Sequence, residues 1–370
     1  MKAMAVEPAR VRAAWQGRIS GCLLGKPVEV LSFEQGRPGL QAYLSNSNAL
    51  PLRDYVPLVK GSIVERLGKD CCRGRIVRAE PDDDINYSVL ALLLLEEHGL
   101  SLTTADVARA WLRLLPAGMT WTAERAAYRT LLDNMADEFV NGADPGFDLR
   151  DCADNAYCEW IGAQIRADLY GWACPGRPAL AAELATRDAT LSHSGDGVHG
   201  AAFIAALGAS IPALDDLDTA IDAALQHIPA DSKTAAAVRF GRALAGRSDA
   251  VDRLHERYEG LSPVHTLNNL ALVVWALCAS DGDFGVAIGD AVAAGWDTDC
   301  NGASVGGLMG LRGGPIPDAW TIPWNGRVGV SLAGYDELPI DELVARTVAV
   351  AESISASFFT SIDGRLGRAS

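Results

Sequence analysis

Two clusters of carboxylates are the features of this sequence most suited to chemistry. Asp82, Asp83 and Asp84 follow a proline and precede a very apolar segment that we expect to be a buried helix. One aspartate at such a place is an ordinary helix cap. Three in succession set like charges side by side, and each close pair costs about 4 kcal/mol at about 4 Å and a dielectric constant of about 20. Either a solvated acidic turn or a bound cation explains the triplet.

The second cluster lies in residues 295–302, Gly-Trp-Asp-Thr-Asp-Cys-Asn-Gly. Asp297 and Asp299 flank a threonine there, and the small residues that follow resume a helical pattern. A double helix cap explains this turn, and so does a metal site. The hard oxygen atoms of the two clusters suit Mg²⁺ or Ca²⁺ better than zinc. Their five carboxylates carry −5, which two divalent ions at +4 nearly balance, so the count favours a two-metal centre.

Two other kinds of enzyme carry acidic motifs of similar appearance. All-helical prenyl-diphosphate enzymes use an aspartate-rich run, but they need a second Asn/Ser/Glu triad, and helical spacing yields none in this sequence. Such an enzyme would also need an apolar tunnel rather than a polar cleft. Haloacid-type phosphatases carry Asp-x-Asp after a buried strand, whereas Asp297 follows an Ala-rich helical segment. An aspartate-rich prenyl-diphosphate enzyme therefore stays a weaker alternative.

The segments that position these residues follow a helical pattern. Apolar residues recur at three- and four-residue steps, and alternating β-branched stretches are nearly absent, apart from room for a small hairpin within 61–80. We expect helices at 8–24, 104–116, 121–138, 157–173, 178–188, 198–209, 217–227, 233–246, 267–279, 284–294, 301–311 and 340–356. Trp121 and Tyr128 share one of these helices and are expected in the core. The fold class is all-α, and residues 1–370 should form a single domain because no long Ser/Gly/Pro linker divides them.

The composition excludes several classes of function. The 370 residues are 49% hydrophobic and 21% charged, which is enough for a sizeable core. A formal charge of −15 disfavours binding to a nucleic-acid backbone. No apolar run approaches the roughly 20 residues of a membrane span, and the N-terminus lacks the apolar core of a secretory signal. With eight scattered cysteines and no CxxC pair, we expect a soluble cytoplasmic protein.

The acidic motifs resemble those of the ADP-ribosylglycohydrolase family, all-α hydrolases that remove ADP-ribose with the help of two Mg²⁺ ions. Residues 21–29 resemble that family's Gly-Asp-Ala-x-Gly-x-x-x-Glu stretch, and Asp82–Asp84 resembles its Thr-Asp-Asp motif. Residues 155–160 fall where the family has a Gly/Asn-rich ligand loop, and residues 191–200 resemble its Ser-His-x-x-x-Gly-Tyr segment. Residues 295–301 resemble its Gly-Gly-Asp-Thr-Asp-Thr-Asn signature, the most specific of the five. The resemblance extends over nearly the whole chain and implies a single large orthogonal helical domain.

The resemblance also implies roles for individual residues. The ligands of two Mg²⁺ ions would be Asp82, Asp83, Asp84, Asp297, Asp299 and Cys300. The catalytic residues would be Asp83, Asp297 and Glu29, which we expect in an irregular segment because it follows Pro27. The residues around ADP-ribose would be Asn155, Tyr157, His193, Gly195, Asp196 and Gly197, with 195–197 as a loop. The reaction would hydrolyse an N- or O-glycosidic bond to ADP-ribose, or to a related ribosyl group, on a protein or a small molecule.

Five positions depart from the family pattern. Asp82 and Cys300 stand where the family has threonine, His199 stands where it has tyrosine, and Cys22 and Lys26 differ from its N-terminal stretch. A sulfur atom is a softer ligand than a hard cation prefers. The departures leave open an altered metal geometry, a different substrate, or a non-catalytic protein that binds ADP-ribose or a nucleotide.

Overall fold

The computed structural model describes residues 4–366, with side chains through Phe358. Its α-helices are α1 (Pro8–Gly25), α2 (Glu29–Asn46), α3 (Ile63–Leu67), α4 (Asp83–His98), α5 (Thr104–Leu114), α6 (Thr122–Asn134), α7 (Gly162–Ile165), α8 (Asp168–Trp172), α9 (Pro178–Ala189), α10 (Gly195–Ser210), α11 (Leu217–Leu225), α12 (Lys233–Ala243), α13 (Ala250–Arg257), α14 (Thr266–Ala279), α15 (Phe284–Ala294), α16 (Thr298–Leu311), α17 (Asp318–Thr321) and α18 (Ile340–Leu366). The short strands β1 (Arg327–Gly329) and β2 (Glu337–Pro339) form an antiparallel pair. The all-α fold class is confirmed.

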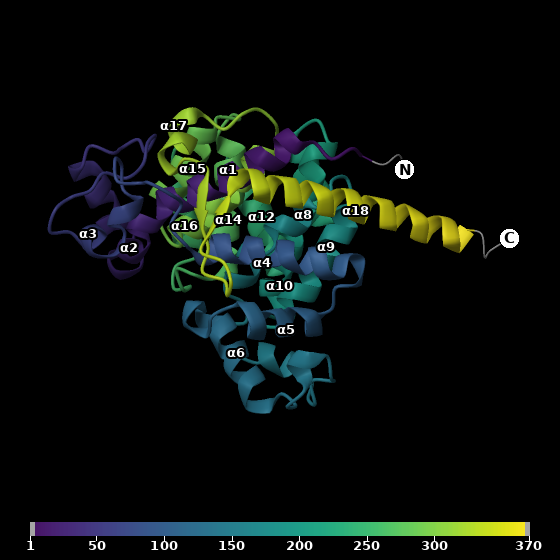
Figure 1. Cartoon of the computed structure of the whole chain (residues 1–370). Coiled ribbons are helices and arrows are strands. Elements are labelled where there is room, and N and C mark those ends of the chain that lie inside the picture. The colour runs from purple at the N-terminus through teal and green to yellow at the C-terminus, as the bar shows by residue number, and fades with distance from the viewer. Residues whose placement is uncertain (1–3, 367–370) are drawn as a thin grey trace.

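The helices surround a central group that includes α1, α14, α15 and α16 (Figure 1). In the same view α2 and α3 form one end of the molecule, α5 and α6 form another, and α18 crosses the body and projects beyond it. One cluster of buried apolar side chains extends along the chain from Val11 to Ile354. The organisation of residues 1–370 as a single domain stays a prediction, and residues 1–3 and 367–370 lie outside the described part.

Helices α1 and α16 pack with their backbones almost in contact. Gly17, Gly21 and Gly25 recur at four-residue steps and therefore share one face of α1. A Cβ atom at Gly21 would lie 1.9 Å from the carbonyl oxygen of Gly302, and one at Gly17 would lie 2.0 Å from that of Gly306. Only residues without a side chain permit this approach. The contact places the end of α1 against the start of α16, next to the second acidic motif.

The structure corrects the prediction of one long helix over 157–173. Its central part forms only the short helices α7 and α8, because the backbone before them pairs with another segment. Ile161 donates its N–H to the carbonyl of Val264, and Trp160 forms a β-bridge with His265. An N–H group that donates to another segment of the chain cannot donate to the preceding turn of a helix. The helix expected over 121–138 ends at Asn134. Residues 61–80, which could have formed a small hairpin, contain the short helix α3 instead.

Two expectations about helix starts near the site were wrong. Glu29 is the first residue of α2 rather than part of an irregular segment. Pro27 lies in the first turn of a 3₁₀-helix, Lys26–Val28, where a missing N–H costs nothing, so the proline helps to start helical structure. The 195–197 segment is the first turn of α10 rather than a loop, and Gly195 has a φ of 51° at that start. Such a φ favours glycine.

Candidate metal centre

Three helices begin at the predicted carboxylates. Glu29 is the first residue of α2, Asp83 is the first residue of α4, and Asp297 precedes the first residue of α16. The Oδ1 atom of Asp82 caps α4 by accepting the N–H of Asp84 at 3.0 Å. The positive end of a helix dipole favours anions at such a place. The two acidic motifs are far apart in sequence, and the fold brings them together at these helix ends.

The potential ligand atoms form three linked groups. Within each group, one ligand atom per residue lies within 4.8 Å of the others. The groups are Cys22–Asp82–Asp84, Asp84–Asp299–Cys300 and Glu29–Asp297–Asp299. Asp84 belongs to the first two groups and Asp299 to the last two, so the three groups are continuous. This arrangement can hold more than one cation.

A cavity of about 420 Å³ opens beside these groups. Its polar wall contains Lys26, Glu29, Asp82, Asp83, Glu124, Asp297 and Cys300. Its apolar wall includes Val30, Phe33, Met119, Trp121, Trp160, Ile161, Ile165 and Val264. Trp121 is 52% exposed at this cavity, so its predicted place in the core was wrong. It precedes α6 as the capping residue and therefore lies outside the apolar face of that helix.

Two basic residues neutralise part of the negative charge. Lys26 forms an ion pair with Asp82 and donates to the carbonyl of Pro81 at 2.9 Å. The fully buried Arg18 binds Asp84 at 2.9 Å and Asp168 at 2.8 Å. Four carboxylates of the centre form no ion pair with any lysine or arginine of the described residues, namely Glu29, Asp83, Asp297 and Asp299. The centre therefore keeps an excess of negative charge.

The excess charge shifts the pKa values of the carboxyl groups. Burial, followed by repulsion from neighbouring carboxylates, raises the pKa of Glu29, Asp83 and Asp297 well above their ordinary values. The same causes raise the pKa of Asp299 to about 6. Burial also acts on Asp82, but Lys26 outweighs it and holds the pKa of that carboxyl below its ordinary value. The carboxylates of the centre therefore need added positive charge to ionise together.

Two oxygen atoms indicate where such charge fits. Asp84 Oδ2 and Asp297 Oδ1 are buried and accept no hydrogen bond from the residues that the structure describes. Buried polar atoms are normally satisfied, so these two require an explanation. Each belongs to a residue of the linked ligand groups. The residues present therefore fit divalent cations, with mostly oxygen ligands of the kind that Mg²⁺ prefers.

His193 lies behind the cavity wall rather than in it. Its side chain is buried, and it is absent from the residues that line the cavity. Its Nε2 atom accepts the N–H of Ala163 at 3.3 Å, and its Nδ1 atom lies 2.8 Å from Ser192 Oγ. Burial lowers the pKa of His193 well below its ordinary value. The ring is therefore neutral, with its proton on Nδ1. Its Nε2 atom lies 3.9 Å from Glu124 Oε1, but the structure does not bring it to the carboxylates of the metal centre.

The start of α10 is also engaged in packing. Asp196 accepts hydrogen bonds from the backbone N–H and the hydroxyl of Thr234, at 3.0 and 2.7 Å. A Cβ atom at Gly197 would lie 2.4 Å from the carbonyl oxygen of Cys158, and one at Gly195 would lie 2.7 Å from Glu159 Oε1. These contacts hold α10 against residues 158–159. Gly195, Asp196 and Gly197 do not line the cavity.

Asn155 and Tyr157 do not line the cavity, but Tyr157 packs against a residue of its wall. Asn155 donates to the carbonyl of Ser192 at 3.0 Å and accepts the N–H of Tyr157 at 2.9 Å. The ring of Tyr157 is 38% exposed and packs edge-on against Trp160, with 4.7 Å between ring centroids. Trp160 itself lines the cavity. Tyr157 is therefore one side chain away from the cavity.

Sequence reasoning missed the cations of the centre and much of the apolar wall. Lys26 had a usable signal, because both it and Asp82 depart from the family pattern and they turn out to be partners. Arg18 also had one, since it stands among small residues in a helix that is otherwise buried. Trp160 lay in the stretch 155–160 that resembles the family's ligand loop, but its place in the cavity wall depends on the pairing with residue 265.

A larger hollow of about 760 Å³ lies away from the carboxylates, between residues that include Asp218, Arg242 and Cys278. Arg242 is paired there with Asp218 at 2.7 Å and with Asp222 at 2.5 Å. Arg242 is thus already paired, and the described residues that line this hollow include no group of buried carboxylates like that of the smaller cavity. The smaller cavity is the better candidate site because it contains buried carboxylates without basic partners.

The fold and the site together define an all-helical protein whose carboxylate centre is suited to divalent cations. The chain belongs to the ADP-ribosylglycohydrolase family, whose profile matches residues 4–349, so the predicted resemblance is confirmed. A solved structure described as an "ADP-ribosylglycohydrolase-related protein complex" has a similar fold, with a TM-score of 0.54 and 20% identity over 93% of this chain and 98% of that chain. No curated protein matches the chain. Within residues 4–366, no helix has the length and apolar composition needed to cross a membrane.

Proposed function

We propose that this protein hydrolyses an N- or O-glycosidic bond to ADP-ribose, or to a related ribosyl group, in the cavity beside α2, α4 and α16. The observation that carries the proposal is the placement of Glu29, which lines the cavity and shares a ligand group with Asp297 and Asp299. Membership of a glycohydrolase family supports the reaction class. The substrate would be an ADP-ribosylated protein or small molecule.

The carboxylates divide into two proposed roles. Asp82, Asp83, Asp84, Asp297, Asp299 and Cys300 make up the proposed ligand set for two Mg²⁺ ions. Such ions, when bound, orient hydroxyl groups and lower the pKa of nearby water. The carboxyl of Glu29 moves a proton at the scissile bond, with Asp83 and Asp297 beside it. Carboxylates around the anomeric carbon stabilise the positive charge of an oxocarbenium-like transition state.

The remaining walls suit the rest of the substrate. Among the described residues that line the cavity, Lys26 is the sole basic one, and it can offset part of a diphosphate charge. The aromatic rings of Phe33, Trp121 and Trp160 can contact a flat base. Roles in ADP-ribose binding for Asn155, Tyr157, His193 and Gly195–Gly197 stay predictions. A cytoplasmic location is likewise proposed, and eight free cysteines suit a reducing compartment.

The test is release of ADP-ribose from defined arginine-linked and serine-linked substrates, with and without Mg²⁺. We expect Mg²⁺-dependent release from at least one linkage, and a loss of about 100-fold or more in Glu29→Gln, because that variant cannot exchange the proton. Glu34→Gln is the matched control, since Glu34 is exposed on the same helix. Full activity in Glu29→Gln contradicts the assignment of Glu29. No release from any substrate, together with binding of free ADP-ribose, would support a non-catalytic binding protein instead.

A further inference from the structure

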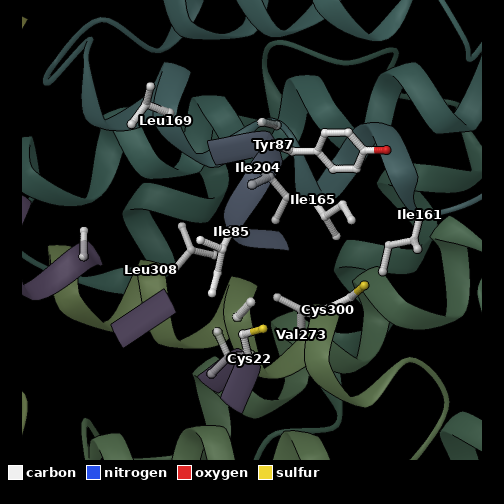
Figure 2. Close-up of a cluster of buried hydrophobic side chains, with 14 of the residues drawn as sticks. Cys22, Ile85, Tyr87, Ile161, Ile165, Leu169, Ile204, Val273, Cys300 and Leu308 are labelled. Carbon is white, nitrogen blue, oxygen red and sulfur yellow. The ribbon is translucent and has the colours of Figure 1, made fainter. Parts of the chain in front are cut away.

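Two cysteines flank Asp84 in the carboxylate centre. Cys22 on α1 belongs to the ligand group with Asp82 and Asp84, and Cys300 on α16 belongs to the group with Asp84 and Asp299. Figure 2 shows both side chains in the same cluster of buried hydrophobic side chains, with Cys22 close to Ile85 of α4 in this view. Each group thus offers one sulfur atom and two carboxylates. The surroundings of the two groups differ in charge and in access.

The group that contains Cys22 already has its counter-charges. Lys26 is paired with Asp82, and Arg18 is paired with Asp84. Arg18 is shared with Asp168, and Asp84 belongs to both groups, but each carboxylate of this group has a basic partner. Cys22 is also fully buried and does not line the cavity. This group therefore has less need of a metal ion than the group that contains Cys300.

The group that contains Cys300 is different on both counts. Asp299 has no lysine or arginine partner within the described residues, and Asp84 Oδ2 accepts no hydrogen bond from them. Cys300 is only 5% exposed but lines the cavity, so the group borders the space through which a cation would enter. One ligand atom each of Asp84, Asp299 and Cys300 lies within 4.8 Å of the others, and Asp84 also has an unsatisfied buried oxygen.

We propose that Asp84, Asp299 and Cys300 bind a borderline divalent cation, such as Zn²⁺ or Co²⁺, through the Cys300 sulfur, while the oxygen ligands Asp297 and Asp299, beside Glu29, keep a hard cation such as Mg²⁺. Thiolate ligands select softer cations than carboxylates do, which is why one centre can hold two kinds of ion. On binding, the S–H bond of Cys300 breaks, its proton passes to solvent, and a metal–sulfur bond forms without any change of oxidation state. The inference rests on the metal-binding part of the proposed function, with a borderline cation in place of one of its two Mg²⁺ ions, and not on the glycosidic reaction.

The test is a titration of Co²⁺ into the metal-free, reduced protein. A cobalt–thiolate bond gives a strong charge-transfer absorption in the near ultraviolet, which an all-oxygen site lacks. We expect this absorption in the native protein and its loss in Cys300→Ser, with Co²⁺ affinity lowered at least about tenfold. Cys278→Ser is the control and should keep the absorption, because Cys278 lines the other hollow. In Cys22→Ser the absorption should also persist.

Several results would overturn the proposal. Cobalt binding without the absorption shows a site with oxygen ligands only, which leaves the metal centre intact but removes Cys300 from it. If the absorption is lost in Cys22→Ser but kept in Cys300→Ser, the sulfur ligand is Cys22 rather than Cys300. Release of ADP-ribose with Mg²⁺ in a protein that does not bind Co²⁺ overturns this inference and supports the proposed function.

A measurement on the unmodified protein covers the case in which Cys300→Ser does not fold. Alkylation of Cys300 by iodoacetamide, mapped by mass spectrometry, should be slowed at least about tenfold by Zn²⁺ and left unchanged by Mg²⁺, because only a metal–sulfur bond blocks the thiol. Cys158, a half-buried thiol outside the three groups, is the internal control. Equal alkylation of Cys300 with both ions contradicts the proposal.

Discussion

Two buried clusters of charge meet the same cavity, and they are balanced in opposite ways. One is the carboxylate centre, in which Glu29, Asp83, Asp297 and Asp299 have no lysine or arginine partner among the described residues. The other surrounds Arg166, which binds Glu124 at 2.5 Å and Asp188 at 2.7 Å. Glu124 also lines the cavity. Identical side-chain types therefore serve in both clusters.

The difference lies in what completes each cluster. In the Arg166 cluster, the chain itself supplies the cation, and Tyr170 adds a hydrogen bond to Asp188 at 2.7 Å. Buried ion pairs of this kind hold the cavity wall in place, and removing one partner leaves the other charge buried without compensation. In the carboxylate centre, the chain supplies too few cations, and we expect cations from solution to complete it. Pairing therefore separates a structural cluster from a binding cluster better than residue type does.

The largest expected effect concerns the paired cluster. Replacing Arg166 by methionine leaves Glu124 and Asp188 buried without a cation, and should lower the free energy of unfolding by about 3–5 kcal/mol. Urea denaturation measures this change. Arg150→Met is the control, because Arg150 is 85% exposed in its pair with Asp148 and should leave stability unchanged. Equal stability of the two variants would remove the distinction between the clusters.

The next effect concerns cation binding to the carboxylate centre. Mg²⁺ at about 100 times its dissociation constant should raise the free energy of unfolding by about 2.7 kcal/mol. Asp297→Asn should lose most of this gain, because it removes an anionic ligand, whereas the exposed Asp281→Asn should keep it. Thermal denaturation with and without Mg²⁺ is the measurement. A gain that persists in Asp297→Asn would place the bound ion elsewhere.

The dependence of folding stability on pH below about 6.5 tests His193, which lies behind the cavity wall. Burial lowers the pKa of His193 below its ordinary value of 6.5, so the unfolded chain takes up a proton that the folded chain refuses. Stability should therefore fall as the pH drops below about 6.5, by up to about 1.4 kcal/mol per pH unit. His193→Gln should flatten this fall, since its amide oxygen can accept the N–H of Ala163. An unchanged slope in the variant contradicts a buried neutral His193.

The smallest expected effect concerns Asp83, whose contribution to stability changes with pH in the opposite direction. Burial and the neighbouring carboxylates Asp82 and Asp84 raise the pKa of Asp83 above its ordinary value of 3.8. The folded chain then binds more protons than the unfolded chain, so the metal-free protein loses stability as the pH rises above that value. Asp83→Asn should gain about 1 kcal/mol at neutral pH without metal, measured by urea denaturation. A loss of stability there would show that Asp83 is already compensated.

Local patterns account for what could be predicted about the fold. The three- and four-residue spacing of apolar side chains placed most of the long helices, and α15 has the bounds that this pattern predicts. The segment 157–173 escaped prediction because its hydrogen bonds go to residues 264–265, distant in sequence. Strands β1 and β2 span three residues each, too short for an alternating pattern.

For the candidate site, the sequence by itself determined which residues offer ligand atoms, because an acidic residue at a helix start is a local feature that recurs in both motifs. It also indicated that Asp82 and Cys300 are unusual. Only the tertiary structure decided which of these groups are compensated, through the pairing of Lys26 with Asp82 and of Arg18 with Asp84. It likewise placed His193 behind the wall. Burial and ion pairing depend on contacts between distant segments, which no local spacing encodes.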